Sequence, residues 1–346
     1  MAGAEVPGVL TARDVLMRMP KVELHLHLEG SIRPALLLEL AERNGVDIGA
    51  STVEGVAGRY QFRDFQHFIE RYLVGMSAIR TPDDLLCAIE ALSSELASQQ
   101  VRYAEVTTTA YAHHLNGIST TDYSDALDIG VRRARIDHGV ELRWIVDIPR
   151  SVETPHEQWT ADLLTGGHAP SDVAAIGLGG PEADYPPRWY AASFERVGAT
   201  GIPAVLHAGE VAGPQSVWEA LAVGAVRIGH GVRSMEDESL VEHLARNQVP
   251  IEVSVTSNVL LKVCPSVGAH PLPAMLGARL NVSLNTDDPG YFSTTLVDEH
   301  LLAHEQLGVS VPELVSAQHR AIDAALCGQS LKDRLHRELS AVSVDP

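Results

Sequence analysis

Short runs of apolar, often β-branched residues alternate along the chain with longer amphipathic stretches. Such runs, bounded by turn residues, are typical of buried strands. The expected strands are Val22–Leu28, Val101–Thr108, Glu141–Ile148, Val173–Gly179, Pro203–His207, Ala225–His230, Ile251–Thr256 and Leu280–Thr286.

The stretches between these runs carry helical signals. Asp83 and Asp84 precede the periodic stretch Leu85–Ser98, and Pro214 opens Gln215–Val223. Acidic residues and proline are typical of the first turn of a helix. Because parallel strands need long crossovers, eight strand–helix units predict an α/β fold, a single (β/α)8 TIM barrel. A doubly wound open sheet is the alternative architecture.

Two segments exceed what a barrel needs: residues 47–80, after the first helix, and the tail beyond Ser293. We expect extra helices there, at the barrel mouth and at the C-terminus. No low-complexity linker, internal repeat or composition break divides the sequence. Residues 1–346 are therefore predicted to form one domain.

Composition limits the partners and the location. The chain has 26 basic and 45 acidic residues and a net charge of -19. This charge repels phosphate backbones and anionic lipid, so no nucleic-acid or membrane partner is expected. Its 3 cysteines have no metal-type spacing and do not suggest a disulfide framework. Residues 1–19 lack the unbroken apolar core of a signal peptide, and we expect a cytoplasmic protein.

Residues of metal-binding type stand at the ends of four expected strands. His25 and His27 are two positions apart on one strand and therefore share a face. Such a pair alone is more often structural. The fifth and sixth expected strands, however, end in His207 and His230, and Asp287 follows the eighth. Catalytic residues of such barrels lie at the carboxyl ends of the strands, so these side chains are predicted to form one site.

Imidazole and carboxylate groups suit Zn²⁺ and leave room for an activated water molecule. Iron or nickel could use the same ligands. The fourth expected strand has no lysine that could be carbamylated to bridge two metals. A single ion is the simpler prediction.

The segment Met19–Pro34, MPKVELHLHLEGSIRP, and four later motifs, HAGE, RIGHGVRS, EVSVTSNVLL and SLNTDDPG, resemble the adenosine deaminase family. The motifs occur in the family order, and the resemblance covers nearly the whole chain. It implies zinc-dependent hydrolytic deamination of a 6-aminopurine. The implied ligands of one Zn²⁺ per chain are His25, His27, His207 and Asp287.

The same resemblance implies roles for four further residues. Glu210 would protonate purine N1, and His230 would position the water molecule and help to deprotonate it. Asp288 would accept a hydrogen bond from N7, and the backbone N–H of Gly180 would reach N3. A proton-donating glutamate predicts a raised pKa for Glu210. A helix cap at Glu210, a turn at Asp288 and a tight strand end at Gly180 are the structural alternatives.

Two positions depart from the family pattern. Glu29 stands where adenosine-specific members have an aspartate that meets the ribose 5′-hydroxyl. Gly177 replaces an aspartate of the fourth-strand motif. We therefore expect an altered sugar side of the pocket, with Glu29 among the substrate-binding residues.

Phe62, Phe65 and Phe68 recur every three residues in the insert, as on one face of a helix. Such a stripe is ordinarily part of a core. In the family this segment forms the apolar wall beside the sugar, and we therefore expect Phe62 and Phe65 to contact the substrate.

These departures resemble the branch of the family that deaminates 6-amino-6-deoxyfutalosine, a menaquinone precursor with an aryl carboxylate tail and no 5′-hydroxyl. We favour it as the small-molecule substrate. Its carboxylate could meet Arg33, Arg63 or Arg188, although each is individually typical of a solvated surface. Adenosine or 2′-deoxyadenosine, and then adenine, are the alternatives. An amide or phosphoester hydrolase and a non-catalytic metal-binding barrel are alternatives of a different class.

Overall fold

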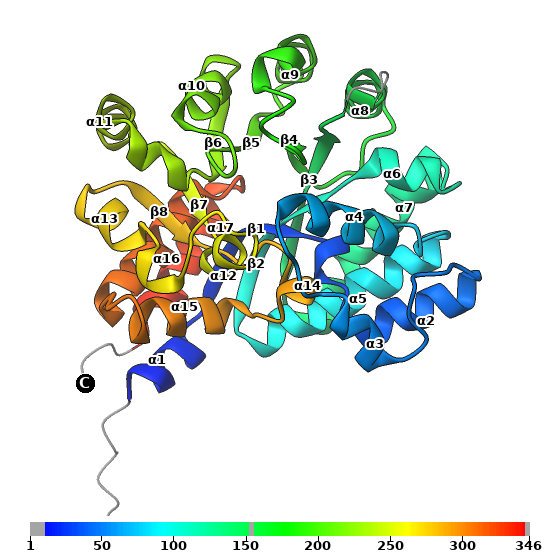
Figure 1. Cartoon of the computed structure of the whole chain (residues 1–346), viewed down its shortest axis with the longest axis horizontal. Helices are drawn as coiled ribbons and strands as arrows, with labels where there is room; N and C mark the ends of the chain where they lie inside the picture. The colour runs from blue at the N-terminus through cyan, green and yellow to red at the C-terminus, as the bar shows by residue number, and fades with distance from the viewer. Residues whose placement is uncertain (1–10, 152–155, 343–346) are drawn as a thin grey trace, which may run out of the picture.

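Eight parallel strands in the order β1 to β8 form a barrel at the centre of the molecule (Figure 1). The computed structural model describes residues 11–151 and 156–342. The strands are β1 (Lys21–His27), β2 (Val101–Thr108), β3 (Glu141–Pro149), β4 (Val173–Gly179), β5 (Ala204–Ala208), β6 (Ala225–His230), β7 (Pro250–Val253) and β8 (Asn281–Leu284). A parallel bridge between Leu26 and Asp287 joins the segment after β8 to β1. The predicted TIM barrel is confirmed.

Helices connect the strands and surround the barrel (Figure 1). In chain order they are α1 (Ala12–Arg18), α2 (Pro34–Asn44), α3 (Val53–Gly58), α4 (Phe65–Met76), α5 (Pro82–Ser98), α6 (Ala110–Leu115), α7 (Thr120–Arg133), α8 (His156–Thr165), α9 (Ala191–Gly198), α10 (Pro214–Ala222), α11 (Glu238–Asn247), α12 (Val255–Leu260), α13 (Leu272–Gly277), α14 (Pro289–Phe292), α15 (Leu296–Glu305), α16 (Val311–Ala324) and α17 (Gln329–Ser340). Both helices predicted from their first turns, α5 and α10, are present. Among the described residues no helix combines the length and the apolar character that a bilayer span requires.

Strand β7 is shorter than predicted. It ends at Val253, and α12 begins two residues later. The carboxylate of Glu299 accepts the backbone N–H groups of Val255 and Thr256, at 3.0 and 3.2 Å. These N–H groups have no partner within the first turn of a helix, so a distant carboxylate supports the helix start.

Strand β8 also ends early, at Leu284. Beyond it, the side-chain oxygen of Asn285 accepts the backbone N–H groups of Leu24 and His25, at 2.8 and 3.2 Å. At this point the Asn285 side chain, and not a backbone carbonyl group, bonds to β1. Backbone pairing with β1 resumes at the bridge between Leu26 and Asp287.

The insert of residues 47–80, which follows α2, contains α3 and α4. Asp64 caps α4 by accepting the backbone N–H of His67 at 2.8 Å, and the helix begins at Phe65. Phe62 therefore lies before the helix, and the prediction that all three phenylalanines share a helical face is wrong. The Phe62 ring packs against Phe68 and Phe292, at centroid distances of 5.3 and 6.0 Å.

The C-terminal tail forms α15, α16 and α17, and α16 packs against β1 and β8. The side chain of Leu326, between α16 and α17, packs against Ile145, Ala175 and Val205. These three residues come from neighbouring strands and form an apolar cluster separate from the main core. The tail thus completes the packing of the barrel. Residues 1–10, on which part of the expectation about the N-terminal segment rests, lie outside the described residues.

Candidate active site

A cavity of about 510 Å³ opens at the carboxyl ends of the strands. This volume is in the range of small-molecule sites. The strand residues that line it are His27, Asp147, Pro149, Gly179, His207 and His230. Residues of α4 and α6 form an apolar wall above them, so the insert covers the barrel mouth.

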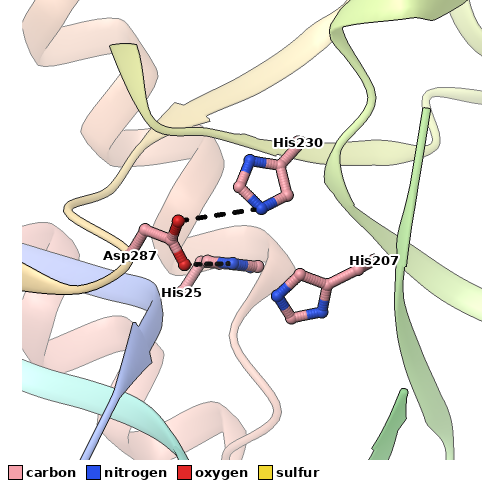
Figure 2. Close-up of side chains that lie close together, drawn as sticks. All are labelled: His25, His207, His230 and Asp287. Carbon is pink, nitrogen blue, oxygen red and sulfur yellow. Dashed lines mark ion pairs between the residues drawn. The ribbon is translucent and has the colours of Figure 1, made fainter. Parts of the chain in front are cut away.

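Four side chains with metal-binding atoms converge below this cavity: His25, His207, His230 and Asp287. Figure 2 shows them turned toward one another, and their ligand atoms all lie within 4.8 Å of each other. Oδ1 of Asp287 lies 3.3 Å from Nε2 of His25, and Oδ2 lies 3.9 Å from Nε2 of His230. The barrel brings these residues together from β1, β5, β6 and the segment after β8.

His27 joins the same group. Its Nε2 lies 3.2 Å from Nε2 of His207 and 3.3 Å from Oδ1 of Asp287. Ligand atoms about 2.0–2.1 Å from a tetrahedral Zn²⁺ are separated by about 3.3 Å. Three distances in the group, at 3.2–3.3 Å, are close to this value, and the His230 distance of 3.9 Å is longer.

The donor chemistry fits a cation. Nε2 of His25 is buried and has no hydrogen-bond partner. Its Nδ1 faces Oε2 of Glu252 at 2.9 Å, so the carboxylate fixes the ring with Nε2 toward the cluster. Metal-binding histidines are usually oriented by such a bond from the other ring nitrogen. Nitrogen and carboxylate donors of this kind suit Zn²⁺.

A second layer of buried polar groups holds these residues. Nε of Arg227 donates a hydrogen bond to Oε1 of Glu252 at 2.5 Å. Nη2 of the same arginine donates to Glu105 at 2.5 Å. Ser257 donates its hydroxyl to Oδ2 of Asp287 at 2.7 Å. Groups of this kind tune metal affinity, because they set the position and basicity of the ligands.

Two residues of the site have left-handed backbone conformations. His230 has a φ of 61° and Asp287 a φ of 66°. Such conformations cost a non-glycine residue about 1–3 kcal/mol and concentrate at functional sites. At these two positions the backbone is held in a strained conformation that directs the side chain into the site.

The sequence profile of the adenosine deaminase family matches residues 20–342. The chain belongs to this family. Aminodeoxyfutalosine deaminase of Streptomyces avermitilis is 35% identical over 334 residues, which cover 95% of this chain and 93% of that protein. An adenine deaminase of Rhodospirillum rubrum is 34% identical, covering 95% of this chain and 98% of that protein. The crystal structure of adenine deaminase from Arthrobacter aurescens superposes with a TM-score of 0.89 at 32% identity, covering 93% of this chain and 98% of that one.

Because the chain belongs to the adenosine deaminase family, it is a metal-dependent hydrolytic deaminase. The named relatives support an aminopurine as the kind of molecule that is deaminated. Membership of this metal-dependent family and the cluster of histidine and aspartate side chains support a bound metal. The residue roles and the individual substrate are separate questions.

Glu210 and His230 face each other beside the metal-binding group, with Nε2 of His230 3.7 Å from Oε2 of Glu210. Burial raises the pKa of Glu210 well above its ordinary value, and the nearby carboxylates of Asp287 and Glu182 add to this effect. The direction agrees with the predicted one. Burial lowers the pKa of His230 to about 3, so this imidazole is neutral.

A chain of hydrogen bonds fixes which nitrogen of His230 carries the hydrogen. The backbone N–H of Leu272 donates to Nδ1 of His270 at 3.1 Å, so the hydrogen of neutral His270 is on Nε2. That nitrogen lies 3.2 Å from Oδ1 of Asn258 and donates to it. The amide nitrogen of Asn258 then donates to Nδ1 of His230 at 3.2 Å. His230 therefore presents an N–H group at Nε2 to the cavity.

Asp288 and Gly180 both line the cavity. Oδ1 of Asp288 is buried without a hydrogen-bond partner, and burial together with the charge of Asp287 raises the pKa of Asp288 well above its ordinary value. Gly180 has a φ of 100°, a conformation that other residues rarely adopt. Both positions agree with a substrate-facing location.

Glu29 and Phe62 are not among the residues that line this cavity, whereas Phe65 is. One oxygen of Glu29 accepts the Thr108 hydroxyl at 2.8 Å and the Thr109 N–H at 3.2 Å, and it lies 2.6 Å from Nε2 of His113. These protein donors hold the carboxylate away from the cavity. No sequence signal connected Glu29 with a histidine 84 positions later.

The three arginines suggested for a substrate carboxylate are also absent from the cavity lining. Arg33 donates to Glu95 and to the carbonyl oxygens of Pro289 and Thr294, and Arg188 pairs with Glu219. The arginine that does line the cavity is Arg150.

Sequence reasoning also missed Glu182, which supports the segment that carries Glu210. Its buried carboxylate accepts four consecutive backbone N–H groups, those of Gly209, Glu210, Val211 and Ala212, at 2.5–3.0 Å. Arg150 donates to the backbone oxygen of His207 in the same segment. A glutamate just after a glycine-rich strand end was the available signal.

Proposed function

We propose that the chain holds one Zn²⁺ and hydrolytically deaminates a 6-aminopurine nucleoside to the 6-oxopurine and ammonia. The observation that carries the proposal is a group of buried donors at ligand-to-ligand distances, with the buried carboxyl group of Glu210 directly beside it. The proposed ligands are His25, His27, His207 and Asp287. The bound ion would lower the pKa of a water molecule and so supply the nucleophile that adds to C6.

Glu210 is proposed as the proton donor to N1. Burial raises its pKa well above the ordinary value, which favours the protonated carboxyl group. Adding an oxygen nucleophile to C6 places negative charge on the ring, and a proton delivered to N1 neutralises it. The amino group then takes the proton of the added hydroxyl group and leaves as ammonia, and the hydroxyl oxygen becomes the 6-oxo group of the aromatic product.

Asp288 is proposed to donate a hydrogen bond to N7. The sequence-based expectation had the direction reversed, because N7 of a purine nucleoside carries a lone pair and no hydrogen. A carboxyl group of raised pKa can donate. Glu210 and Asp288 would then withdraw electron density from the ring on both sides of C6, which favours addition there.

His230 is proposed to orient the attacking water molecule by donating from Nε2. The family resemblance suggested help with deprotonation, but a nitrogen that already carries a hydrogen accepts no proton. The relay through Asn258 and His270 assigns the hydrogen to this nitrogen. The proton that the attacking water molecule loses is therefore accepted by a group other than His230.

For the substrate, we propose 6-amino-6-deoxyfutalosine ahead of adenosine. The apolar wall of α4 and α6 supports this choice, because an aryl substituent would bury its ring against it. The residues of this wall are Phe65, Phe68, Ile69, Tyr72, Leu73, Met76, Tyr111, Ala112 and Leu115. The relative from Streptomyces avermitilis carries the corresponding name.

Adenine is the second candidate, because the Rhodospirillum rubrum and Arthrobacter aurescens relatives are adenine deaminases of similar identity. An ultraviolet assay of aminodeoxyfutalosine, adenosine, 2′-deoxyadenosine and adenine tests the choice, with zinc content measured on the same sample. The highest kcat/KM is expected for aminodeoxyfutalosine. Equal or better turnover of adenosine or adenine contradicts the preference.

A further inference from the structure

Asp147 on β3 is a buried acid that points into the active-site cavity. Its side chain is 3% exposed, it lines the cavity, and its Oδ1 has no hydrogen-bond partner. A buried carboxylate oxygen without a partner is unfavourable by about 1–3 kcal/mol or more. Such an atom in a cavity wall indicates a partner on the ligand.

Two glycines of β4 make room for this acid. A Cβ atom at Gly177 would lie 2.9 Å from Cβ of Asp147, and one at Gly179 would lie 2.8 Å from its Oδ2. Gly177 pairs with Asp147 across the two strands. The absence of an acid at position 177 and the presence of one at position 147 are therefore parts of one arrangement.

The other acidic residues that line the described cavity already have proposed tasks: Glu210, Asp287 and Asp288. Glu29 is occupied by the donors from Thr108, Thr109 and His113. Asp147 is thus the lining acid with an oxygen left to bind a substrate.

The donor that Asp147 meets follows from the rest of the site. The purine would have N1 at Glu210, N7 at Asp288, N3 at Gly180 and C6 at the metal group. The hydrogens of the 6-amino group stay with C6 at the metal group, and no ring hydrogen of a nucleoside remains for a further acid, whereas the sugar on N9 offers hydroxyl groups. Asp147 also lies near His27, and its strand β3 neighbours β4, which precedes Gly180 at N3, the ring nitrogen on the sugar side of the purine.

We infer that Asp147 accepts a hydrogen bond from a sugar hydroxyl and selects nucleosides over the free base. This inference rests on the proposed function, because it requires a nucleoside substrate. A site built to bind a hydroxyl discriminates strongly against an analogue that lacks it, since its own buried polar atom is then left unpaired. Asp147 is therefore a specificity residue of this site.

The test compares the wild type with Asp147→Asn and Asp147→Ala on adenosine, its 2′-, 3′- and 5′-deoxy analogues and adenine. In the wild type, one deoxy analogue should have a kcat/KM at least about tenfold below that of adenosine. In Asp147→Ala this difference should fall to within about twofold, because the hydroxyl has lost its partner. Adenine turnover should change little in either variant. Asp147→Asn, which keeps the side-chain volume and one accepting oxygen, covers the case in which the alanine variant folds poorly, because loss of the negative charge should still reduce the difference between adenosine and the deoxy analogue.

Glu29→Gln is the matched control, since it alters a buried acid whose partners are protein groups. It should change adenosine and adenine turnover by the same factor. Zinc content is measured on every variant, because loss of the metal would also lower the turnover of all substrates together. An equal loss on all substrates, or unchanged discrimination among the deoxy analogues, overturns the role of Asp147 while wild-type nucleoside turnover still supports the proposed function. A wild type that deaminates only adenine overturns both.

Discussion

Nδ1 of His25 lies 2.9 Å from Oε2 of Glu252, and both side chains are buried. Replacing Glu252 by glutamine removes the negative charge that orients this histidine and raises its basicity. We expect the affinity for Zn²⁺ to fall by about 10- to 100-fold. Competition with a chromogenic chelator measures the loss.

Glu236→Gln is the control for this measurement, because Glu236 forms an exposed pair with Arg233. Its metal affinity should equal that of the wild type. Unchanged affinity in Glu252→Gln would show that the histidine is held by the barrel backbone alone.

Glu210→Gln should lower kcat by about 100-fold or more, the contribution of a positioned general acid. The amide retains the shape of the side chain but has no acidic proton for N1. Zinc content and the melting temperature should stay near wild-type values, because Glu210 is not a proposed ligand. Full activity in this variant would remove Glu210 from the mechanism.

Asn258→Asp tests the hydrogen-bond relay to His230. A carboxylate accepts from both histidines, so it would draw the hydrogen of His230 from Nε2 to Nδ1. We expect kcat to fall by about 100-fold or more, as when a catalytic histidine has the wrong tautomer. Nitrogen-15 NMR shifts of the His230 ring report the change directly. Asn247→Asp on the surface of α11 should leave both kcat and the shifts unaltered.

Glu299→Gln should change how stability depends on pH. Burial raises the pKa of Glu299 from 4.5 to about 7, although its bonds to Thr256 and Thr294 oppose the shift. Between these values the folded protein holds a proton that the unfolded chain releases, so this residue's stabilising contribution is lost as pH rises from about 4.5 through about 7.

The glutamine variant lacks this titration, and its amide can still accept from the helix N–H groups and donate to the Thr294 hydroxyl. Relative to the variant, the wild type should lose up to about 3 kcal/mol of unfolding free energy between pH 4.5 and pH 8. Urea titrations of the metal-free proteins at both pH values measure the difference. Parallel pH dependence in the two proteins would show that Glu299 is ionised throughout.

The sequence predicted the order of strands and helices because apolar periodicity is a local signal. It overestimated β7, because the distant Glu299 accepts the backbone N–H groups that follow this strand. It overestimated β8, because the side chain of Asn285 takes the place of a backbone partner for β1. The proposed ligands were recognisable because each lies near or just beyond the carboxyl end of a strand. The position of Glu29 was not, since it depends on His113. Asp147 was missed because nothing local distinguishes an acid that faces a cavity from one on a surface strand.

The bridge between Leu26 and Asp287 has a consequence for biosynthesis. A nascent chain that has emerged only as far as β7 contains His25, His27 and His207 but lacks the carboxylate that faces all of them. Contacts between sequence-distant segments form late, because closing a long loop costs entropy before any contact rewards it. A site that retains the ion should therefore form only after Asp287 has been added to the chain, and a product truncated before Asp287 should be unable to retain the ion.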